Sequence, residues 1–389
     1  MSGYDVAIVG GGATGSATAH YLAQFEPSLS IVVFEKDPTY EYCSTLRSDG
    51  NLRTQFSLEE NIRMSQYTFD LLETFAEDLA TDDWRPDLAP RHEGNLFLTD
   101  AAGVEAAEAG MAIQQALGCA VQWLEAADIA RRWPAYRAEG IAGGVYGPND
   151  GTIDSYALLH GFRRSALRMG VAYLAAEVTG IRATGDTVTG VDLIDGTSVT
   201  APVVVNCAGG WAAGLARTVG VDLPVVPVMR TVFSVDTLLD TAGLPLVVTP
   251  GGAYALPEGG RSFSMAWSQP TDPEGFDFRF SREGFEDVVW PEIVATLPEF
   301  DQLTVTGGWT GIYAVNQLDG NALLGPWDPV AGLYLATGFS GHGFQHTPAM
   351  GRYLAELIVG RSPTIDLQRL NPSRAVEGRP LFEHAGRIV

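Results

Sequence analysis

Short apolar runs followed by glycines recur at three widely separated places in the chain. The three units span residues 6–20, 203–216 and 333–358, and each continues into an alanine-rich or amphipathic segment. This pattern predicts a buried strand, a glycine turn and a helix in each unit. We expect the three strands to assemble into one sheet, with the intervening segments forming a second domain.

The turn of the first unit has the spacing of a dinucleotide-binding loop. Gly10 permits a tight turn, Gly12 lets the backbone approach a pyrophosphate, and Gly15 lets the helix pack closely on the strand. A second apolar strand is expected over residues 31–34, and it ends in Glu35, 20 positions after Gly15. The Glu35 carboxylate can accept hydrogen bonds from a ribose, and the helix N-terminus offers N–H groups to phosphates. The sequence therefore predicts a dinucleotide site.

The rest of the pattern mixes helices and strands. Apolar residues at helical spacing predict helices over residues 58–79, 101–117, 126–133, 156–169, 282–297 and 347–359. Short apolar runs between turns predict strands near residues 94–98, 177–181 and 188–192, and residues 224–306 read mainly as strands.

Composition and charge narrow the class of protein. The chain has 389 residues, of which 46% are hydrophobic, enough for two domains or one interleaved pair with a sizeable core. The net charge is −23 and Lys36 is the only lysine, so nucleic acid and anionic membranes are disfavoured as partners. Adaptation to high salt, or solubility alone, also explains such an acidic surface.

Two further features concern where the protein works. No apolar run reaches the roughly 18–20 residues that cross a bilayer, and no basic, apolar leader precedes the first strand. Cys43, Cys119 and Cys207 are far apart, which fits a reducing cytoplasm and matches no metal-ligand spacing. We therefore expect a cytoplasmic protein with no transmembrane segment, no signal peptide and no metal site.

These residues give the chain, end to end, a resemblance to the flavin amine oxidoreductases of the D-amino-acid oxidase superfamily, which include sarcosine oxidases, glycine oxidase and dimethylglycine dehydrogenase. Besides the set from Gly10 to Glu35, the resemblance rests on the Asn-Cys-Ala-Gly-Gly-Trp turn at 206–211 and the Gly-Phe-Ser-Gly-His-Gly loop at 338–343. Within the superfamily, residues 55–62 and 336–343 are most similar to the FAD-dependent oxidoreductase domain-containing proteins.

The resemblance implies an α/β fold, α+β overall. A discontinuous Rossmann-like FAD-binding domain with a parallel sheet is expected over residues 1–80, 145–223 and 307–389. A substrate-binding domain with a mainly antiparallel sheet is expected over residues 81–144 and 224–306.

The resemblance also implies a set of residues around FAD. The pyrophosphate and adenosine are expected near Gly10, Gly12, Ala13, Thr14, Gly15, Glu35, Lys36 and Val178, with Ala208, Gly209 and Trp211 closing on the dinucleotide. The flavin is expected near Ser44, Thr45, Asn51, Leu52, Gly308, Gly311, Gly338, Ser340, Gly341, His342, Gly343, Phe344 and Gln345. A glycine-dense loop lets N–H groups approach a carbonyl that becomes anionic on reduction, and the helix expected from Thr347 favours the same charge.

Departures from the family pattern concern the covalent attachment of the flavin to the protein and the reaction of the reduced flavin with oxygen. No cysteine follows Cys207, and Arg47 stands where a tethering histidine would fall, so we expect non-covalent FAD. The positions of two family lysines, in residues 263–267 and at Gln345, are not lysine here. Without a localised cation, oxygen activation loses support, which favours a dehydrogenase, although His342 or an arginine could substitute.

Arg53 stands where the family binds the substrate carboxylate, and a guanidinium can hold a carboxylate through two hydrogen bonds. A structural salt bridge is the alternative role. The other catalytic candidates are His342, Tyr254, Tyr313 and Gln345, with Arg230 and Trp267 as further pocket candidates; Tyr254 and Tyr313 are equally compatible with ordinary sheet positions.

We expect an FAD-dependent dehydrogenase or oxidase that oxidises the C–N bond of an amino acid or N-alkyl amino acid. Hydride goes to flavin N5, and the resulting imine hydrolyses. The electron acceptor is oxygen, a quinone or an electron-transfer protein. Two alternatives remain: a 2-hydroxy-acid dehydrogenase on the same fold, with His342 as the base, and a non-catalytic FAD-binding assembly factor.

Overall fold

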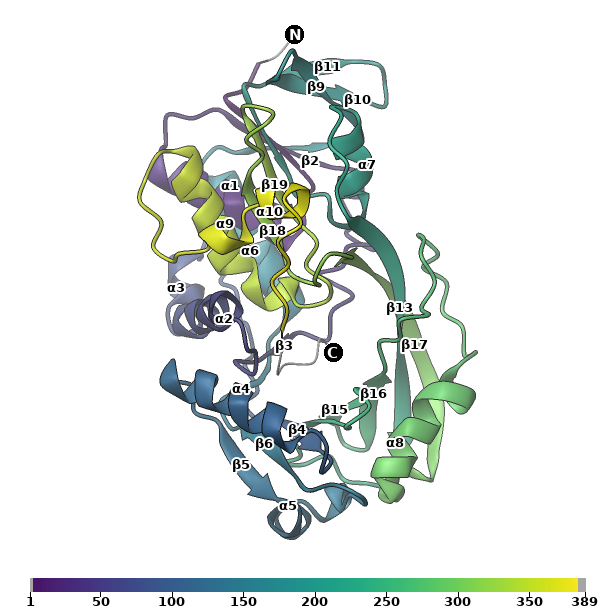
Figure 1. The fold of residues 1–389 in the computed structure, drawn as a ribbon. Coiled ribbons are helices and arrows are strands. Elements are labelled where there is room, and N and C mark those ends of the chain that lie inside the picture. Colours follow the sequence, from purple (N-terminus) through teal and green to yellow (C-terminus); the bar gives the residue numbers. More distant parts are fainter. Residues whose placement is uncertain (1–2, 384–389) are drawn as a thin grey trace.

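A computed structural model describes residues 3–383. Two sheets dominate it, one in each half of the molecule in Figure 1, and the long strands β13 and β17 run between the halves.

The six-stranded sheet lies in the upper half of Figure 1 and contains the three predicted strand-glycine-helix units. Its order is β18 (Leu323–Pro326), β19 (Leu333–Thr337), β12 (Val203–Asn206), β1 (Val6–Val9), β2 (Ile31–Glu35) and β8 (Ala172–Ala175). β19, β12 and β1 are neighbours and pair in parallel, which confirms that distant segments build one sheet. β8 and β18, which the sequence pattern did not predict, form the edges, and β18 is antiparallel.

Helices cover one face of this sheet and a small sheet covers the other. The first layer contains α1 (Ala13–Phe25), α2 (Glu59–Leu72), α3 (Phe75–Asp78), α6 (Ser155–Arg168) and α9 (Gly343–Ile358). The second contains β9 (Val178–Thr184), β10 (Thr187–Leu193), β11 (Ser198–Thr200) and α7 (Ala212–Arg217). Apolar strands covered on both faces account for the continuous apolar runs in the sequence. A Cβ at Gly351 would lie 2.5 Å from the Cβ of Ala17, so the helices α1 and α9 need a glycine where they cross.

The eight-stranded sheet lies in the lower half of Figure 1 and is antiparallel except where β14 pairs with β4. Its order is β17 (Leu303–Asn316), β13 (Val225–Thr237), β16 (Ser262–Ala266), β15 (Tyr254–Gly259), β14 (Leu246–Val248), β4 (Asn95–Thr99), β6 (Gly143–Gly147) and β5 (Gln122–Glu125). Packed with it are α4 (Val104–Ala116), α5 (Ala126–Arg132) and α8 (Trp290–Thr296). β3 (Asn51–Leu52) pairs with β7 (Gly151–Thr152), and α10 (Ser373–Val376) lies near the C-terminus. Short 3₁₀ turns span Pro134–Tyr136, Gly209–Trp211, Pro298–Phe300 and Gln368–Leu370, and a π-helical turn spans Phe285–Val289.

The structure corrects three predicted helices. The helix expected over 58–79 is split into α2 and α3, and the one expected over 282–297 begins with the π-helical turn. The last helix begins at Gly343 rather than near Thr347, with His342 as its N-cap. Glycine is a poor helix former, so the sequence pattern hides this first turn.

The expected domain boundaries cut through two strands. β6 spans the boundary after residue 144 and β17 spans the boundary after residue 306. The two sheets are distinct, and the division of the chain into the five segments given above stays a proposal.

Candidate FAD and substrate site

A cavity of about 570 Å³ extends from the carboxyl ends of β1 and β2 to the face of the eight-stranded sheet. This volume is in the range of ligand pockets. Most of the predicted site residues line it: Gly10, Gly12, Ala13, Thr14, Glu35, Lys36, Ser44, Thr45, Asn51, Arg53, Val178, Ala208, Gly209, Trp211, Arg230, Tyr254, Trp267, Gly311, Tyr313, Gly341, His342, Gly343, Phe344 and Gln345. Sequence motifs more than 300 residues apart therefore meet around one space.

Several predicted residues support the cavity without lining it. A Cβ at Gly15 would lie 2.0 Å from the Gly10 carbonyl oxygen, so this glycine allows the helix to pack on its strand. Leu52 is buried in the core beside α2, and Gly338 and Ser340 have φ angles of 75° and 50° in the loop before α9. Their contribution is to the shape of the backbone around the cavity.

At one end of the cavity the structure forms a site suited to a pyrophosphate and a ribose. Gly10 has a φ of 98°, and a Cβ there would lie 2.5 Å from the Cys207 carbonyl oxygen, so the turn requires glycine. Gly12, which has no side chain, is the N-cap of α1; the first turn carries no acid, and the Ala13 N–H donates to Thr45 Oγ1 at 3.3 Å. The N-terminus of this helix favours an anion.

Glu35 lies beside this turn with both carboxylate oxygens hydrogen-bonded. Oε2 accepts from the Gly11 N–H and Oε1 from the Asp37 N–H, each at 2.9 Å, while burial raises the pKa of the Glu35 carboxyl. Glu35 thus fixes the glycine turn and still has lone pairs for a ribose. Nearby, the Lys36 ammonium lies 3.5 Å from the centre of the Trp211 ring, so two predicted dinucleotide residues contact each other.

The glycine loop before α9 is held close to Tyr313. A Cβ at Gly341, where φ is 105°, would lie 2.3 Å from the Tyr313 ring, and one at Gly343 would lie 2.6 Å from Phe339. The Ser340 N–H donates to the Ala314 carbonyl at 2.9 Å, and Ser340 Oγ accepts from the Asn316 N–H at 3.0 Å. The loop is therefore attached to the end of β17.

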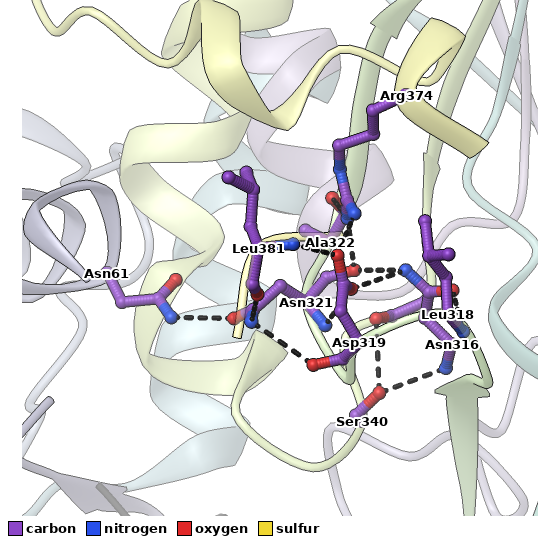
Figure 2. A network of polar contacts seen from close by, with 10 residues as sticks. Asn61, Asn316, Leu318, Asp319, Asn321, Ala322, Ser340, Arg374 and Leu381 are labelled. Atoms are coloured by element: carbon purple, nitrogen blue, oxygen red, sulfur yellow. Dashed lines mark hydrogen bonds and ion pairs between the residues drawn. The ribbon is translucent and has the colours of Figure 1, made fainter. Parts of the chain in front are cut away.

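Behind the loop, a buried polar network fixes the end of β17 (Figure 2). The Asn316 side-chain amide donates to Asp319 and to the Asn321 carbonyl, and Asp319 forms an ion pair with Arg374. Arg374 also donates to the carbonyls of Asn321 and Ala322, and both ionised side chains are at most 2% exposed. Through Arg374, the C-terminal segment thus stabilises the end of β17, to which the loop before α9 is attached.

At the other end of the cavity, Arg53 is buried against aromatic rings. Its guanidinium lies 4.1 Å from the Phe56 ring centre and 5.2 Å from that of Phe97, and it donates to the Gln55 carbonyl. Its backbone N–H donates to Gln345 Oε1 at 2.8 Å, so Gln345 positions this residue. Burial lowers the pKa of Arg53 to about 10, which leaves it a cation at neutral pH.

His342 lies near Arg53 as a neutral imidazole. Neither of its ring nitrogens has a hydrogen-bond partner among residues 3–383, and its ring centre is 5.7 Å from that of Phe56. Burial and the Arg53 charge lower the pKa of His342 to about 3. It is therefore neither a fixed cation nor an effective base near neutral pH.

The structure adds Asp49, which the sequence did not single out. Its Oδ2 accepts a hydrogen bond from the Tyr254 hydroxyl, and its Oδ1 is buried with no hydrogen-bond partner in the described part of the chain. Burial, reinforced by the charge of Glu258, raises the pKa of Asp49 to about 7. The only sequence signal was an acid between the flavin candidates Thr45 and Asn51.

Two other pocket candidates have partners in the protein. Arg230 forms an ion pair with Asp272 and donates to the Gln269 carbonyl at 2.9 Å, so its charge is balanced. The Trp267 indole N–H donates to the Gly251 carbonyl at 3.0 Å, which fixes the ring at the edge of the cavity.

Known proteins match almost the whole chain. Residues 5–357 match the FAD dependent oxidoreductase family, DAO. The chain belongs to this family. It is 35% identical to FAD-dependent oxidoreductase domain-containing protein 1 of Xenopus laevis, over 97% of this chain and 84% of that protein. It is 27% identical to the glycine oxidase of Geobacillus kaustophilus, over 96% of this chain and 97% of that protein.

Solved structures show the same architecture. The crystal structure of glycine oxidase from Geobacillus kaustophilus superposes with a TM-score of 0.82 at 26% identity, covering 96% of this chain and 99% of that one. L-proline dehydrogenase from P. horikoshii, at 24% identity, has the same fold with a TM-score of 0.84, covering 98% of this chain and all of that one.

The protein is thus an FAD-dependent oxidoreductase, and the expected fold class and cofactor are confirmed. The glycine turn, the N-terminus of α1 and Glu35 fit the dinucleotide part of FAD, and the loop before α9 fits the flavin. Across residues 3–383, no helix is long and apolar enough to cross a membrane, and no cluster of histidine, cysteine and acidic residues could hold a metal ion.

Proposed function

We propose that the protein oxidises the C–N bond of an amino acid or N-alkyl amino acid to an imine, which water hydrolyses. Bound FAD would supply the two-electron acceptor for the hydride that leaves the carbon next to nitrogen. The observation that carries the proposal is the buried guanidinium of Arg53, which lines the same cavity as the glycine loop before α9.

A carboxylate is the ligand group that this guanidinium favours. Arg53 is desolvated yet charged, and a guanidinium can bind a carboxylate through two parallel hydrogen bonds. Its position is fixed by Gln345 through the backbone and by Phe56 through the ring contact. A carboxylate anchored there would have its α carbon held in one orientation within the cavity.

The aromatic hydroxyls of the pocket remain protonated. Burial raises the pKa of Tyr313 to about 12 and that of Tyr254 well above its usual value. Because the Tyr254 hydroxyl donates to Asp49, Tyr313 is the one of the two that can donate a hydrogen bond to a substrate without adding charge. The similarity to glycine oxidase supports a small amino acid as the substrate class.

The 2-hydroxy-acid alternative requires a base beside the alcohol. His342 was the candidate, and a pKa of about 3 makes this imidazole a weak proton acceptor at neutral pH. His342 therefore does not supply the base that this alternative requires.

The choice between oxidase and dehydrogenase depends on cations near the flavin. Lys36 lies over Trp211 at the dinucleotide end, and His342 is neutral. Arg230 is paired with Asp272, and Arg53 is assigned to the substrate. A dehydrogenase that passes electrons to a quinone or an electron-transfer protein is therefore favoured over direct reaction with oxygen.

Anaerobic bleaching of the flavin tests the proposal. The holoenzyme is mixed with glycine, N-methylglycine, N,N-dimethylglycine, proline and the matched 2-hydroxy acids, and the loss of flavin absorbance is followed. Bleaching by at least one amine, and not by its hydroxy analogue, supports C–N oxidation. Bleaching by hydroxy acids alone supports the alternative dehydrogenase, and no bleaching by any of them favours the assembly factor.

A further inference from the structure

The polar loop between β2 and β3 carries Asp49 into the substrate end of the cavity. Asp49 lies four residues before Arg53, and both line the cavity together with Tyr254, Tyr313 and His342. The Tyr254 hydroxyl donates to Oδ2, while Oδ1 is buried and accepts no hydrogen bond from residues 3–383.

A buried carboxylate oxygen without a donor is costly to a folded protein. The surrounding groups do not supply that donor to Oδ1. Tyr254 already donates to Oδ2, Tyr313 lies against the glycine at 341, and the Arg53 guanidinium donates to the Gln55 carbonyl over the Phe56 ring. A ligand in the cavity that carries an N–H group would satisfy Oδ1.

The geometry points to Asp49 as the group that binds the substrate nitrogen and accepts its proton. This role rests on the proposed function, because it assigns the second end of the same amino-acid substrate. Arg53 would hold the carboxylate, and Asp49 Oδ1 would hold the ammonium group.

An N–H bond of the substrate ammonium breaks and an O–H bond forms on Asp49 Oδ1, so the carboxylate becomes a neutral acid and the amine gains a lone pair. Bound FAD would then accept the hydrogen of the α C–H bond together with its electron pair, and the nitrogen lone pair would form the C=N bond. The proton on Asp49 returns to solvent after the product leaves.

The electrostatic surroundings suit this exchange. Tyr254 on β15 and Tyr313 on β17 stay protonated, Glu258 on β15 adds a negative charge, and Arg53, just after β3, is a cation in the lining of the same cavity. The pKa of Asp49, about 7, makes it an ionised acceptor in mildly alkaline solution and a stable acid once protonated. Asp49 should therefore bind an ammonium group above about pH 7 and lose this ability as the pH falls through that value.

Binding of two unreactive analogues tests the role without turnover. 2-Aminoisobutyrate carries an ammonium and a carboxylate but no α hydrogen, and pivalate has the same shape with a methyl group in place of the nitrogen. Their affinities are measured from the perturbation of flavin absorbance in the wild-type holoenzyme, in Asp49→Asn and in the control Asp70→Asn, an exposed position of α2 outside the cavity.

We expect the wild-type protein and Asp70→Asn to prefer 2-aminoisobutyrate at pH 8, and Asp49→Asn to bind it about 10- to 100-fold more weakly while pivalate is unaffected. An unchanged preference in Asp49→Asn, or no preference in the wild type, would overturn the role of Asp49.

A pH profile separates proton acceptance from a structural contribution. The rate of anaerobic flavin reduction in the wild type should fall below about pH 7, and Asp49→Asn should lack this limb. Glu258→Gln keeps the base but removes a charge that raises the pKa of Asp49, so its limb should move to lower pH. An identical limb in all three proteins would refute proton acceptance by Asp49.

The two proposals fail in different ways. If no amine reduces the flavin while the analogue preference is present and depends on Asp49, C–N oxidation is refuted and ammonium binding is retained. If amines reduce the flavin normally in Asp49→Asn at all pH values, the proposed function stands and the role of Asp49 is refuted.

Discussion

Replacing Arg53 by lysine keeps the charge and removes the planar pair of donors. The guanidinium now contacts the Phe56 and Phe97 rings and the Gln55 carbonyl, and lysine cannot reproduce these contacts while also holding a carboxylate at two points. Truncating one partner of a desolvated charge pair costs roughly 2–5 kcal/mol. At about 1.4 kcal/mol per decade, kcat/KM should fall about 30-fold to several thousand-fold.

The substitution should also change the pH dependence. Burial lowers the pKa of Arg53 to about 10, and the same burial would lower the pKa of a lysine from a lower starting value. The lysine variant should therefore lose its charge, and its remaining activity, as the pH rises, whereas the wild type keeps its charge.

The assay is anaerobic flavin reduction by the best amine, normalised to bound FAD, in wild type, Arg53→Lys, Arg53→Met and the control Arg63→Lys. Arg63 lies on the exposed side of α2, paired with Glu59, outside the cavity. A purely structural Arg53 would instead lower the melting temperature and the FAD content, with normal reduction of the remaining holoenzyme. Equal rates per flavin in all four proteins would refute the carboxylate anchor.

Three further predictions concern FAD and the loop that lines its site. Acid denaturation should release all the flavin into the supernatant, since burial raises the pKa of Cys43 and keeps this cavity thiol protonated; flavin retained on the precipitate would identify a tether. Glu35→Ala should weaken FAD binding by about 1–3 kcal/mol in a fluorescence titration, because the Gly11 and Asp37 N–H groups lose their acceptor; unchanged affinity would place the ribose elsewhere. Asp319→Asn should lower the unfolding free energy by about 3–5 kcal/mol and speed FAD release, because it leaves Arg374 buried without its counter-charge; exposed Asp301→Asn is the control, and equal stability would contradict this stabilising role.

The sequence predicted the centre of the FAD-binding sheet because its strands are buried on both faces. Three of its strands are short apolar runs followed by glycine turns, and these two signals together predict a strand and the turn after it. The three are Val6–Val9, Val203–Asn206 and Leu333–Thr337. The edge strands lacked that signal. Ala172–Ala175 is half-buried to exposed, and Leu323–Pro326 ends in glycine and proline, so neither run resembles a strand in isolation.

The site residues that could be predicted also depend on local sequence, whereas the one that was missed depends on residues far away in the chain. The glycines at 10, 12, 341 and 343 were predicted from their motifs, and at 10, 341 and 343 the protein itself approaches too closely for a Cβ. Asp49 was not, because its chemistry depends on Tyr254, which is 205 positions away in the chain, and on burial that only the assembled cavity provides. An isolated aspartate in a polar loop has no such signature.

The charges on the substrate side of the cavity support the proposal that a zwitterion binds in preference to a hydroxy acid. Arg53 supplies a buried cation, and Asp49, above about pH 7, supplies a buried carboxylate with one oxygen that lacks a donor among the described residues. An amino acid would bring a carboxylate to the first and an ammonium to the second. A 2-hydroxy acid leaves the negative charge of Asp49 balanced only by hydroxyl donors, and the preference for amines should therefore grow as the pH rises through 7.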